Sequence, residues 1–227
     1  MASEKSTIAG LEILLAGGAG GLGSATAELL EAEGAHVVIS SRNHGLRADI
    51  TKATDRKGLL EAVPKLYGLV VFTGTPARGA AEDVMRQSHE VNFEGPILLA
   101  REAAERMKAS GTAGAIVLFS TMQAIGLFPG STAYAGEKVA LLHSARILAK
   151  ECRGTTEIRV NVIAPGVMAA GMAEASIASG KYERYLTDGV IPRYGKAADV
   201  ARAVRFFLEP DNYVTGQVLS VDGGITL

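Results

Sequence analysis

Short apolar runs alternate with longer segments of helical periodicity along this chain. Continuous apolar runs bounded by turn residues are typical of strands that are buried on both faces of a parallel sheet. Such strands are predicted at residues 11–17, 36–40, 68–74, 114–120, 158–164 and 216–221. Helical patterns lie between them, most clearly at residues 24–33, 82–110, 133–153 and 198–208. The alternation predicts an α/β fold, a doubly wound parallel sheet with helices on both faces.

The pattern is continuous, without a linker, a repeat or a low-complexity segment. At 227 residues, with 48% hydrophobic and 21% charged residues, the chain is expected to form a single domain, residues 1–227. The connection at about 167–194 is the longest without a strand pattern. We expect it to form one or two short helices in a flexible flap that covers a ligand.

Charge and composition exclude several kinds of partner. The formal net charge of −1, without long runs of like charge, indicates no nucleic acid and no membrane surface as a partner. No targeting segment and no membrane-spanning run of apolar residues is recognisable, so a cytoplasmic protein is predicted. Cys152 is the only cysteine, which excludes an internal disulfide, and the scattered histidines imply no metal site.

A glycine-rich segment, LLAGGAGGLGSATAELL, joins the first predicted strand to the first predicted helix. Gly17, Gly21 and Gly23 have the spacing G-x-x-x-G-x-G. Such a turn lets the backbone approach a pyrophosphate closely and points the amides of a helix N-terminus at the anion. The alternative is a turn that only packs the helix on the strand. Its place between strand and helix favours a dinucleotide site.

The end of the second predicted strand indicates which nicotinamide cofactor is preferred. An acidic residue there would accept hydrogen bonds from the ribose of NAD, whereas a basic residue would pair with the additional phosphate of NADP. The strand ends in ISSRN, with Arg42 and no acid, and with His44 and Arg47 nearby. This predicts a preference for NADP(H). NAD(H) remains an alternative, because Asp49 could contact the ribose in another register.

Tyr134 and Lys138 are four residues apart in the helical segment STAYAGEKVALL. Residues at this spacing share one helix face, and here that face continues into Leu141 and Ala145, which are expected to be buried. Lysine is rarely buried without a partner or a task. One interpretation is that Lys138 extends to solvent and Tyr134 belongs to the core. The other is that the two residues form a catalytic pair.

Further motifs follow the glycine turn in order along the chain. They are ADIT at 48–51, VNFEG at 91–95, VLFST at 117–121, APG at 164–166 and YVTGQVLSVDGG at 213–224. With the glycine turn and Tyr134-x-x-x-Lys138, they resemble the short-chain dehydrogenase/reductase family over essentially the whole chain. The resemblance implies a Rossmann-like fold and an NAD(P)-dependent oxidoreductase that interconverts a carbonyl and a secondary alcohol.

The resemblance implies a catalytic set of Asn92, Thr121, Tyr134 and Lys138. Thr121 stands thirteen residues before Tyr134, where the family usually has serine, and Ser120 is the alternative for that role. Thr121 would polarise the carbonyl, Tyr134 would supply the proton, and Asn92 would retain a water for proton transfer. An ammonium one helical turn away is expected to lower the pKa of Tyr134 towards the range useful for acid–base catalysis.

The same resemblance implies contacts to cofactor and substrate. The predicted cofactor residues are Gly17, Gly21, Leu22, Gly23, Ser41, Arg42, Asp49, Ile50, Thr73, Gly74, Tyr134, Lys138, Pro165, Gly166 and Met168. The predicted substrate residues are Ser120, Met122, Phe128 and Met172, with Ile125 beside them. The substrate is expected to be a small carbonyl or alcohol. A homodimer or homotetramer is expected through the helices at about 92–110 and 134–152.

Three departures from the family pattern motivate an alternative function. The segment from Arg42 to Asp49 is short, so a helix beside the adenine is expected to be missing. VFTG at 71–74 replaces the usual N-N-A-G, and Ala169 and Ala170 stand where a threonine would contact the cofactor. The alternative is therefore a non-catalytic dinucleotide-binding or sensor protein on the same fold.

Overall fold

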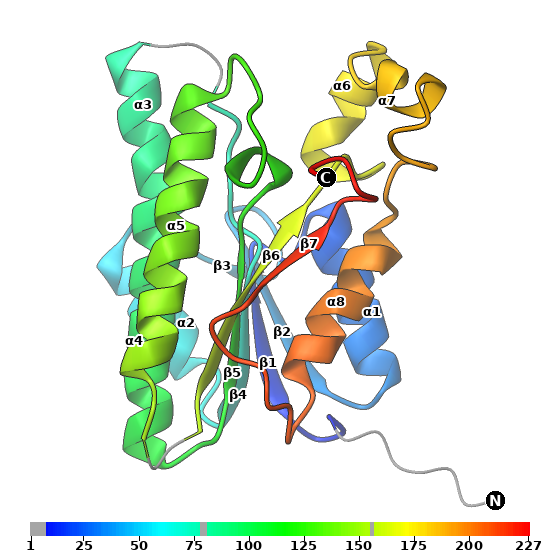
Figure 1. The fold of residues 1–227 in the computed structure, drawn as a ribbon. Helices are drawn as coiled ribbons and strands as arrows, with labels where there is room; N and C mark the ends of the chain where they lie inside the picture. The colour runs from blue at the N-terminus through cyan, green and yellow to red at the C-terminus, as the bar shows by residue number, and fades with distance from the viewer. Residues whose placement is uncertain (1–7, 78–80, 155–156) are drawn as a thin grey trace, which may run out of the picture.

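A parallel sheet forms the centre of the molecule in the computed structural model, which describes residues 8–77, 81–154 and 157–227 (Figure 1). The seven strands of this sheet run parallel in the order β3-β2-β1-β4-β5-β6-β7. They are β1 (Glu12–Ala16), β2 (His36–Ser41), β3 (Leu46–Arg47), β4 (Leu66–Val71), β5 (Ala115–Phe119), β6 (Arg159–Pro165) and β7 (Val218–Val221). The predicted single-domain, doubly wound α/β fold is confirmed.

Helices cover both faces of the sheet (Figure 1). Successive strand residues point to opposite faces, so each strand contributes to two cores. In β1, Leu14 and Ala16 pack in the core shared with α2, α4 and α5, whereas Ile13 and Leu15 pack in the core shared with α1 and α8. The helices concerned are α1 (Gly21–Ala32), α2 (Ala53–Glu61), α4 (Gly95–Ser110), α5 (Thr132–Glu151) and α8 (Ala197–Leu208).

Strand β3 and helix α2 are two elements that the apolar pattern did not predict. Strand β3 is short and exposed, and it pairs with β2 through Ser40 and Leu46 and through Ser41 and Arg47. The connection between β2 and β3 contains no helix, which confirms the predicted loss at this place. At Gly45, φ is +68° and an added Cβ would lie 2.3 Å from the carbonyl oxygen of Ile39, so only glycine allows this close return.

The helical segment predicted at 82–110 is interrupted by a wider turn. It consists of α3 (Glu82–His89), a π-helical turn at Glu90–Glu94 and then α4. A π-helical turn inside a helix often marks a functional site, and this one contains the buried Asn92. Neither this segment nor any other helix in the described part of the chain is both long and apolar enough to cross a membrane.

The connection after β6 contains the short helices that the sequence predicted. A 3₁₀ turn at Gly171–Ala173 leads into α6 (Glu174–Ala178), and α7 (Glu183–Thr187) follows. Residues 167–194 are called the flap below. The flap packs in a small apolar cluster apart from the two cores of the sheet, in which Val167 and Ile191 of the flap meet Met122 and Ile225. Its flexibility stays a prediction.

Candidate active site

A cavity of about 880 Å³ lies at the carboxyl ends of the strands. Small-molecule sites typically have volumes of roughly 300–1,000 Å³. The strand order reverses between β1 and β4, and ligands of open α/β sheets bind at such a switch point. The predicted cofactor residues all line the cavity: Gly17, Gly21, Leu22, Gly23, Ser41, Arg42, Asp49, Ile50, Thr73, Gly74, Tyr134, Lys138, Pro165, Gly166 and Met168.

The glycine-rich turn leaves no room for side chains at two of the three glycines of the G-x-x-x-G-x-G motif. At Gly17, φ is +76° and an added Cβ would lie 2.8 Å from Oγ1 of Thr73. At Gly23, an added Cβ would lie 2.4 Å from the carbonyl oxygen of Gly18. Helix α1 begins here, and the first amides of a helix have no acceptor within the helix. The turn is therefore a cradle that fits a pyrophosphate.

The loop after β2 presents Arg42 at one end of this cavity. The Ser41 hydroxyl holds the loop, because its Oγ donates to the carbonyl oxygen of His44 and accepts from the His44 amide, both at 2.8 Å. Arg42 also lines a smaller neighbouring cavity of about 190 Å³, together with Arg47 and Asp49. This end of the site carries the basic side chains at which the sequence predicted recognition of a phosphate, together with the carboxylates of Asp49 and Asp55.

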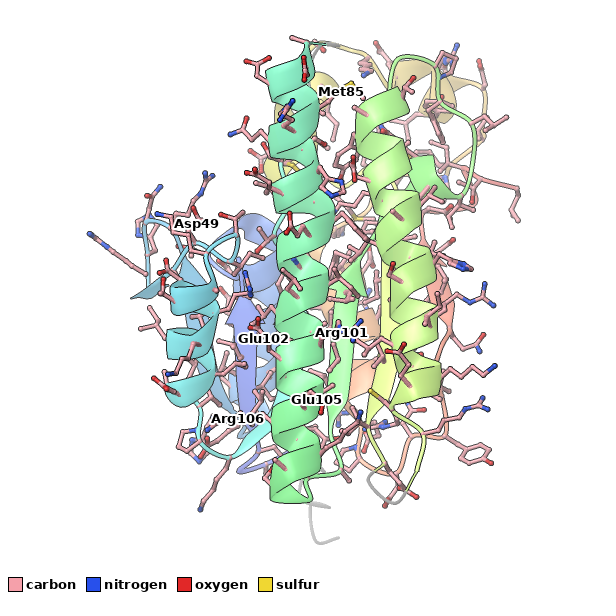
Figure 2. The ribbon with its side chains drawn as sticks, turned by 90° about the vertical axis from the view of Figure 1, so that its left-hand side faces the viewer. Asp49, Met85, Arg101, Glu102, Glu105 and Arg106 are labelled. Carbon is pink, nitrogen blue, oxygen red and sulfur yellow. The ribbon has the colours of Figure 1, made fainter. Side chains whose placement is uncertain are left out.

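A buried arginine fixes the loop after β3. Arg56 is 5% exposed, and its Nη1 donates to the carbonyl oxygens of Ile50 at 3.0 Å and Thr51 at 3.3 Å. Its Nε donates to Glu102 on α4 at 3.0 Å, and Figure 2 shows the outer face on which α2 and α4 lie side by side. The pair holds Ile50 and Thr51 at the cavity. Its partners are far apart in sequence, so the pattern could not predict it.

Lys138 is buried on α5 beneath the cavity wall, with 2% of its surface exposed. Its Nζ donates to the carbonyl oxygen of Phe119 at 2.9 Å. Burial lowers the pKa of Lys138 to about 8. The interpretation in which Lys138 extends to solvent is therefore wrong, because the ammonium group is enclosed at the end of β5.

Tyr134 lies one helical turn before Lys138 and lines the same cavity. Burial raises the pKa of Tyr134 to about 12, and the nearby Tyr182 raises it further, while a side-chain hydrogen bond with Thr121 acts in the opposite direction. The expectation that Lys138 lowers the pKa of Tyr134 is thus wrong for this structure. Poor solvation of the phenolate outweighs the favourable contact with Thr121.

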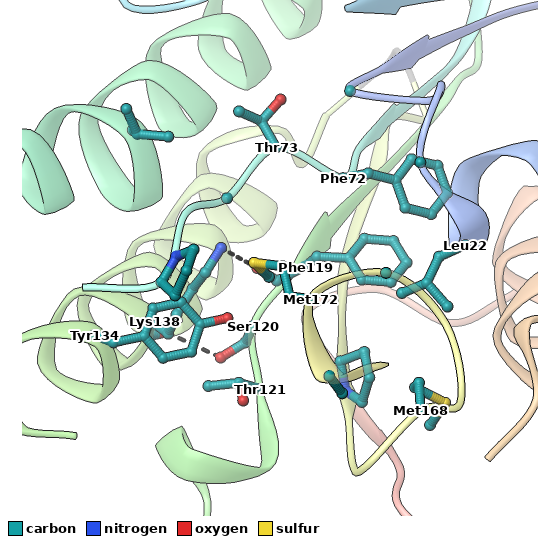
Figure 3. A pocket seen from close by; sticks show the side chains of 18 of the residues that line it. Leu22, Phe72, Thr73, Phe119, Ser120, Thr121, Tyr134, Lys138, Met168 and Met172 are labelled. Atoms are coloured by element: carbon teal, nitrogen blue, oxygen red, sulfur yellow. Dashed lines mark hydrogen bonds between the residues drawn. The ribbon is translucent and has the colours of Figure 1, made fainter. Parts of the chain in front are cut away.

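The two hydroxyl groups at the end of β5 have different partners. Ser120 Oγ donates to the carbonyl oxygen of Lys138 at 3.0 Å, which ties β5 to α5. Thr121 instead interacts with the Tyr134 hydroxyl and with the amide of Gln123. Figure 3 shows Tyr134, Ser120 and Thr121 grouped on one side of the pocket. Both residues line the cavity, and Ser120 alone uses its hydroxyl hydrogen on the backbone of α5.

Asn92 is completely buried and does not line the cavity. Its Oδ1 accepts from the amide of Thr75 at 2.9 Å, and its Nδ2 donates to the carbonyl oxygen of Thr75 at 2.9 Å and to Ser88 Oγ at 3.0 Å. The side chain therefore fixes the loop after β4 to the π-helical turn. It does so beside Lys138, because a Cβ on Gly74 would approach both Asn92 Oδ1 and Lys138 Nζ.

The predicted substrate residues lie at the cavity with one exception. Ser120, Met122, Phe128 and Met172 line it. Ile125 does not: it ends a 3₁₀ turn and is 43% exposed, so its predicted place is wrong.

Sequence reasoning missed part of the lining of the cavity. Phe72 packs on Phe119 with ring centroids 4.5 Å apart, at the position where an amide was expected. The flap contributes Lys181, Tyr182, Arg184 and Tyr185. The sequence KYERY was the available signal, because it repeats a basic residue followed by an aromatic residue within one helical turn.

Cys152 lies outside the lining of the cavity. Cys152 is 2% exposed, and burial raises the pKa of its thiol, which makes it a structural residue. Within the described residues, no group of three or more His, Cys, Asp or Glu side chains is placed to hold a metal ion.

Comparisons with known proteins agree with this geometry. A family model described as enoyl-(acyl carrier protein) reductase matches residues 47–226. The chain is 32% identical to carbonyl reductase family member 4 of Danio rerio, with 93% of this chain and 96% of that protein covered. It is 33% identical to 3-oxoacyl-[acyl-carrier-protein] reductase of Rattus norvegicus, with the same coverage.

A solved structure shares the fold over nearly the whole chain. It is a short-chain type dehydrogenase/reductase from Mycobacterium ulcerans, which superposes with a TM-score of 0.88 at 27% identity. The superposition covers 97% of this chain and 91% of that one. The likeness therefore includes the glycine turn, the strand ends and the flap together.

Proposed function

Because the chain belongs to the short-chain dehydrogenase/reductase family, we propose that it is an NADP(H)-preferring oxidoreductase that interconverts a carbonyl and a secondary alcohol. One observation carries the proposal: Tyr134, Thr121 and Lys138 line the same cavity as the glycine turn. The whole chain acts as one oxidoreductase domain, and the flap at about 167–194 covers the substrate.

Reduction of a carbonyl requires a hydride donor at carbon and a proton donor at oxygen. A bound nicotinamide dinucleotide supplies the hydride. Thr121 orients the carbonyl oxygen, and the Tyr134 hydroxyl donates the proton to it. A pKa of about 12 keeps Tyr134 protonated at neutral pH, so it is ready to act as an acid.

Oxidation of an alcohol places the opposite demand on Tyr134. The tyrosine must then act as a base, and with a pKa of about 12 its ionisation at pH 7 costs about 7 kcal/mol, at roughly 1.4 kcal/mol per pH unit. Lys138, with a pKa of about 8, is mainly protonated at pH 7 and offers a positive charge one turn away. The same phenolate forms when Tyr134 donates its proton in reduction, so this cost applies to both directions.

Lys138 and Asn92 have supporting roles in this proposal. The Lys138 ammonium group also holds a cofactor ribose hydroxyl, as the family resemblance implies. Both polar atoms of the Asn92 side chain form hydrogen bonds, with Thr75 and Ser88. We therefore propose that Asn92 positions the loop that carries Gly74. Retention of a proton-transferring water near Asn92 stays a prediction.

The test of the chemistry is a Tyr134→Phe variant. We expect turnover of a carbonyl panel with NADPH to fall by roughly 10²- to 10⁴-fold, the usual contribution of a positioned acid. Cofactor binding should remain close to that of the parent, because the ring is kept. Tyr213→Phe is the matched control, since Tyr213 is fully exposed and lies outside the cavity. Equal turnover of the Tyr134→Phe variant and the parent would remove the enzymatic proposal.

The cofactor preference is tested by calorimetric titration with NADPH and NADH in parallel. A guanidinium–phosphate contact from Arg42 should make NADPH bind roughly 10- to 100-fold more tightly. Arg42→Gln should abolish the difference, and Arg101→Gln, an exposed change on α4 outside the cavity, should preserve it. A preference for NADH would indicate that Asp49, and not Arg42, contacts the cofactor ribose. Binding of neither cofactor would require the enzymatic claim to be withdrawn.

A second candidate function is a non-catalytic dinucleotide-binding or sensor protein. The replacement of an asparagine by Phe72 favours this second function. Phe72 packs on Phe119, whereas the family has amide side chains here that organise the site. The enclosed Lys138 and the Thr121–Tyr134 hydrogen bond favour the enzyme, since a binding protein has no need of a proton donor. The Tyr134→Phe test separates the two functions.

We further propose a small-molecule substrate, a cytoplasmic location and a homodimer or homotetramer. An outward stripe on α5 supports the oligomer. Val139 is 45% exposed and Ile147 is 47% exposed, and residues eight apart share one helix face.

A further inference from the structure

Two cation–aromatic pairs stand at the beginning of α7 in the flap. Lys181 Nζ lies 5.5 Å from the ring centroid of Tyr182, and Arg184 Cζ lies 5.0 Å from that of Tyr185. Arg184 Nη2 also donates to the Tyr185 hydroxyl at 3.2 Å. Both rings pack on the apolar cluster that includes Val167 and Ile191, and the two cations, which are themselves exposed, lie against these rings. All four residues line the main cavity.

The charges of the flap are sorted between its two sides. Glu174, Glu183 and Asp188 do not line the cavity, whereas Lys181 and Arg184 do. Among the described residues that line the cavity, only Asp49 and Glu90 carry a carboxylate. Glu90 begins the π-helical turn, and Asp49 follows β3, which lies at the far end of the sheet order from β6 and β7. The side of the flap that faces the cavity is therefore positive.

Tyr182 connects these cations to the reacting groups. It lies close enough to Tyr134 to influence the pKa of that hydroxyl electrostatically. The ammonium group of Lys181 lies over the same Tyr182 ring. A carbonyl compound held between Thr121 and Tyr134 can thus extend past Tyr182 to Lys181 and Arg184.

We propose that the flap selects carbonyl substrates that carry an anionic group, a carboxylate or a phosphate, which pairs with Lys181 and Arg184. A guanidinium presents a planar pair of donors that matches an oxyanion, and an ammonium adds a point charge. Both charges lie at the wall of a cavity, where a bound substrate displaces water and strengthens the contact. The inference rests on the proposed function, because it names the substrate class of the same site.

The test measures binding without turnover. The full-length protein, alone and saturated with NADP⁺, is titrated by calorimetry with 4-oxopentanoate, 6-oxoheptanoate and the primary amide of each. Oxidised cofactor cannot reduce a ketone, so only binding is recorded. Dihydroxyacetone phosphate and dihydroxyacetone form the phosphate arm. The arm in which the anion binds more tightly than its neutral partner shows whether the site prefers a carboxylate or a phosphate.

We expect an anion to bind roughly tenfold more tightly than its neutral partner, as charge-assisted hydrogen bonds allow. The difference should shrink with added sodium chloride. Lys181→Gln and Arg184→Gln should each reduce it, and the double variant should abolish it. Lys65→Gln is the matched control, because Lys65 is an exposed cation just before β4, at the opposite end of the strands.

Two outcomes would overturn the inference. One is equal binding of anions and neutral partners by the parent. The other is a loss of NADP⁺ affinity in the double variant, which would assign the cations to the cofactor.

Turnover of the same compounds with NADPH separates this inference from the proposed function. Charge-dependent binding without any reduction would leave the flap site standing and contradict the enzyme. Reduction without a preference for anions would support the enzyme and contradict the role of the flap.

Discussion

Lys138 combines two properties that rarely occur together, a charge and nearly complete burial. The Phe119 carbonyl oxygen offers its amine one hydrogen bond, and burial lowers its pKa to about 8. A cation in such a place weakens the fold at neutral pH, because water solvates the ammonium group better than the protein does. The charge of Lys138 at the cavity is therefore kept at the expense of the stability of the fold.

This cost predicts a pH-dependent difference between the parent and a Lys138→Met variant. The folded-state pKa lies below the usual value of 10.5, so the unfolded chain binds more protons between pH 8 and 10.5, and stability rises with pH there. Below pH 8, burial of the charged Lys138 lowers the free energy of unfolding by about 3 kcal/mol, and the hydrogen bond to Phe119 raises it by about 1 kcal/mol. The variant should therefore be more stable by about 2 kcal/mol at pH 7.

Urea unfolding of the parent and the Lys138→Met variant, at several pH values between 7 and 10, tests the predicted sign of the stability difference. The advantage of the variant should shrink steadily as pH rises above 8. The raised pKa of Tyr134 affects stability only above pH 10, where stability falls, and it is common to both proteins. A constant difference across this range would show that Lys138 titrates normally.

At the scale of elements, the turn from β1 into α1 depends on backbone that approaches closer than a side chain allows. Gly23 packs α1 on Gly18 of the preceding turn. Gly20 lies beside them with a φ of −81° and no atom within 4 Å of an added Cβ. The two glycines have similar positions in the sequence but different structural roles.

Gly23→Ala should therefore displace α1 and weaken the dinucleotide site. We expect it to destabilise the protein by more than about 1 kcal/mol, as overpacking usually does, and to lower NADPH affinity at least about tenfold, because the helix N-terminus moves. Thermal unfolding and calorimetry check both effects. Gly20→Ala should destabilise the protein less than Gly23→Ala, because its only expected cost is that of alanine at the N-cap of α1 and its added Cβ meets no atom within 4 Å. Equal stability of the two variants would contradict the packing argument.

At the scale of the whole molecule, the cavity lies at the carboxyl ends of the strands, so the outer faces of the helices are available for contacts with other proteins. Helices α4 and α5 run side by side on one face (Figure 2). The exposed apolar residues Val139 and Ile147 lie on α5, whereas the similarly exposed Phe206 lies on α8. The two exposed apolar side chains on α5 are the basis of the proposed contact surface.

The α5 stripe should carry the proposed interface between copies of the chain. A Val139→Glu/Ile147→Glu variant should sediment as a monomer, because two carboxylates cannot be buried there without partners. The parent should sediment as a dimer or tetramer. Phe206→Glu is the comparison: dissociation by this change alone would place the interface on α8 instead.

The sequence by itself determined the features that depend on local spacing. Apolar runs predicted the buried strands, and the glycine spacing predicted the turn whose cavity the structure contains. Tyr134 and Lys138 were expected on one helix face because residues four apart share it. Neighbouring residues set each of these features.

Only the tertiary structure decided what each group contacts. Arg56 donates to Glu102, which lies 46 positions away in the sequence. The Ser120 hydroxyl donates to the carbonyl oxygen of Lys138, whereas the Thr121 hydroxyl interacts with Tyr134. The flap places Lys181 at the cavity, which the KYERY sequence alone does not show. Such contacts, and the pKa values that follow from burial, arise between segments that are distant in sequence, so no local pattern contains them.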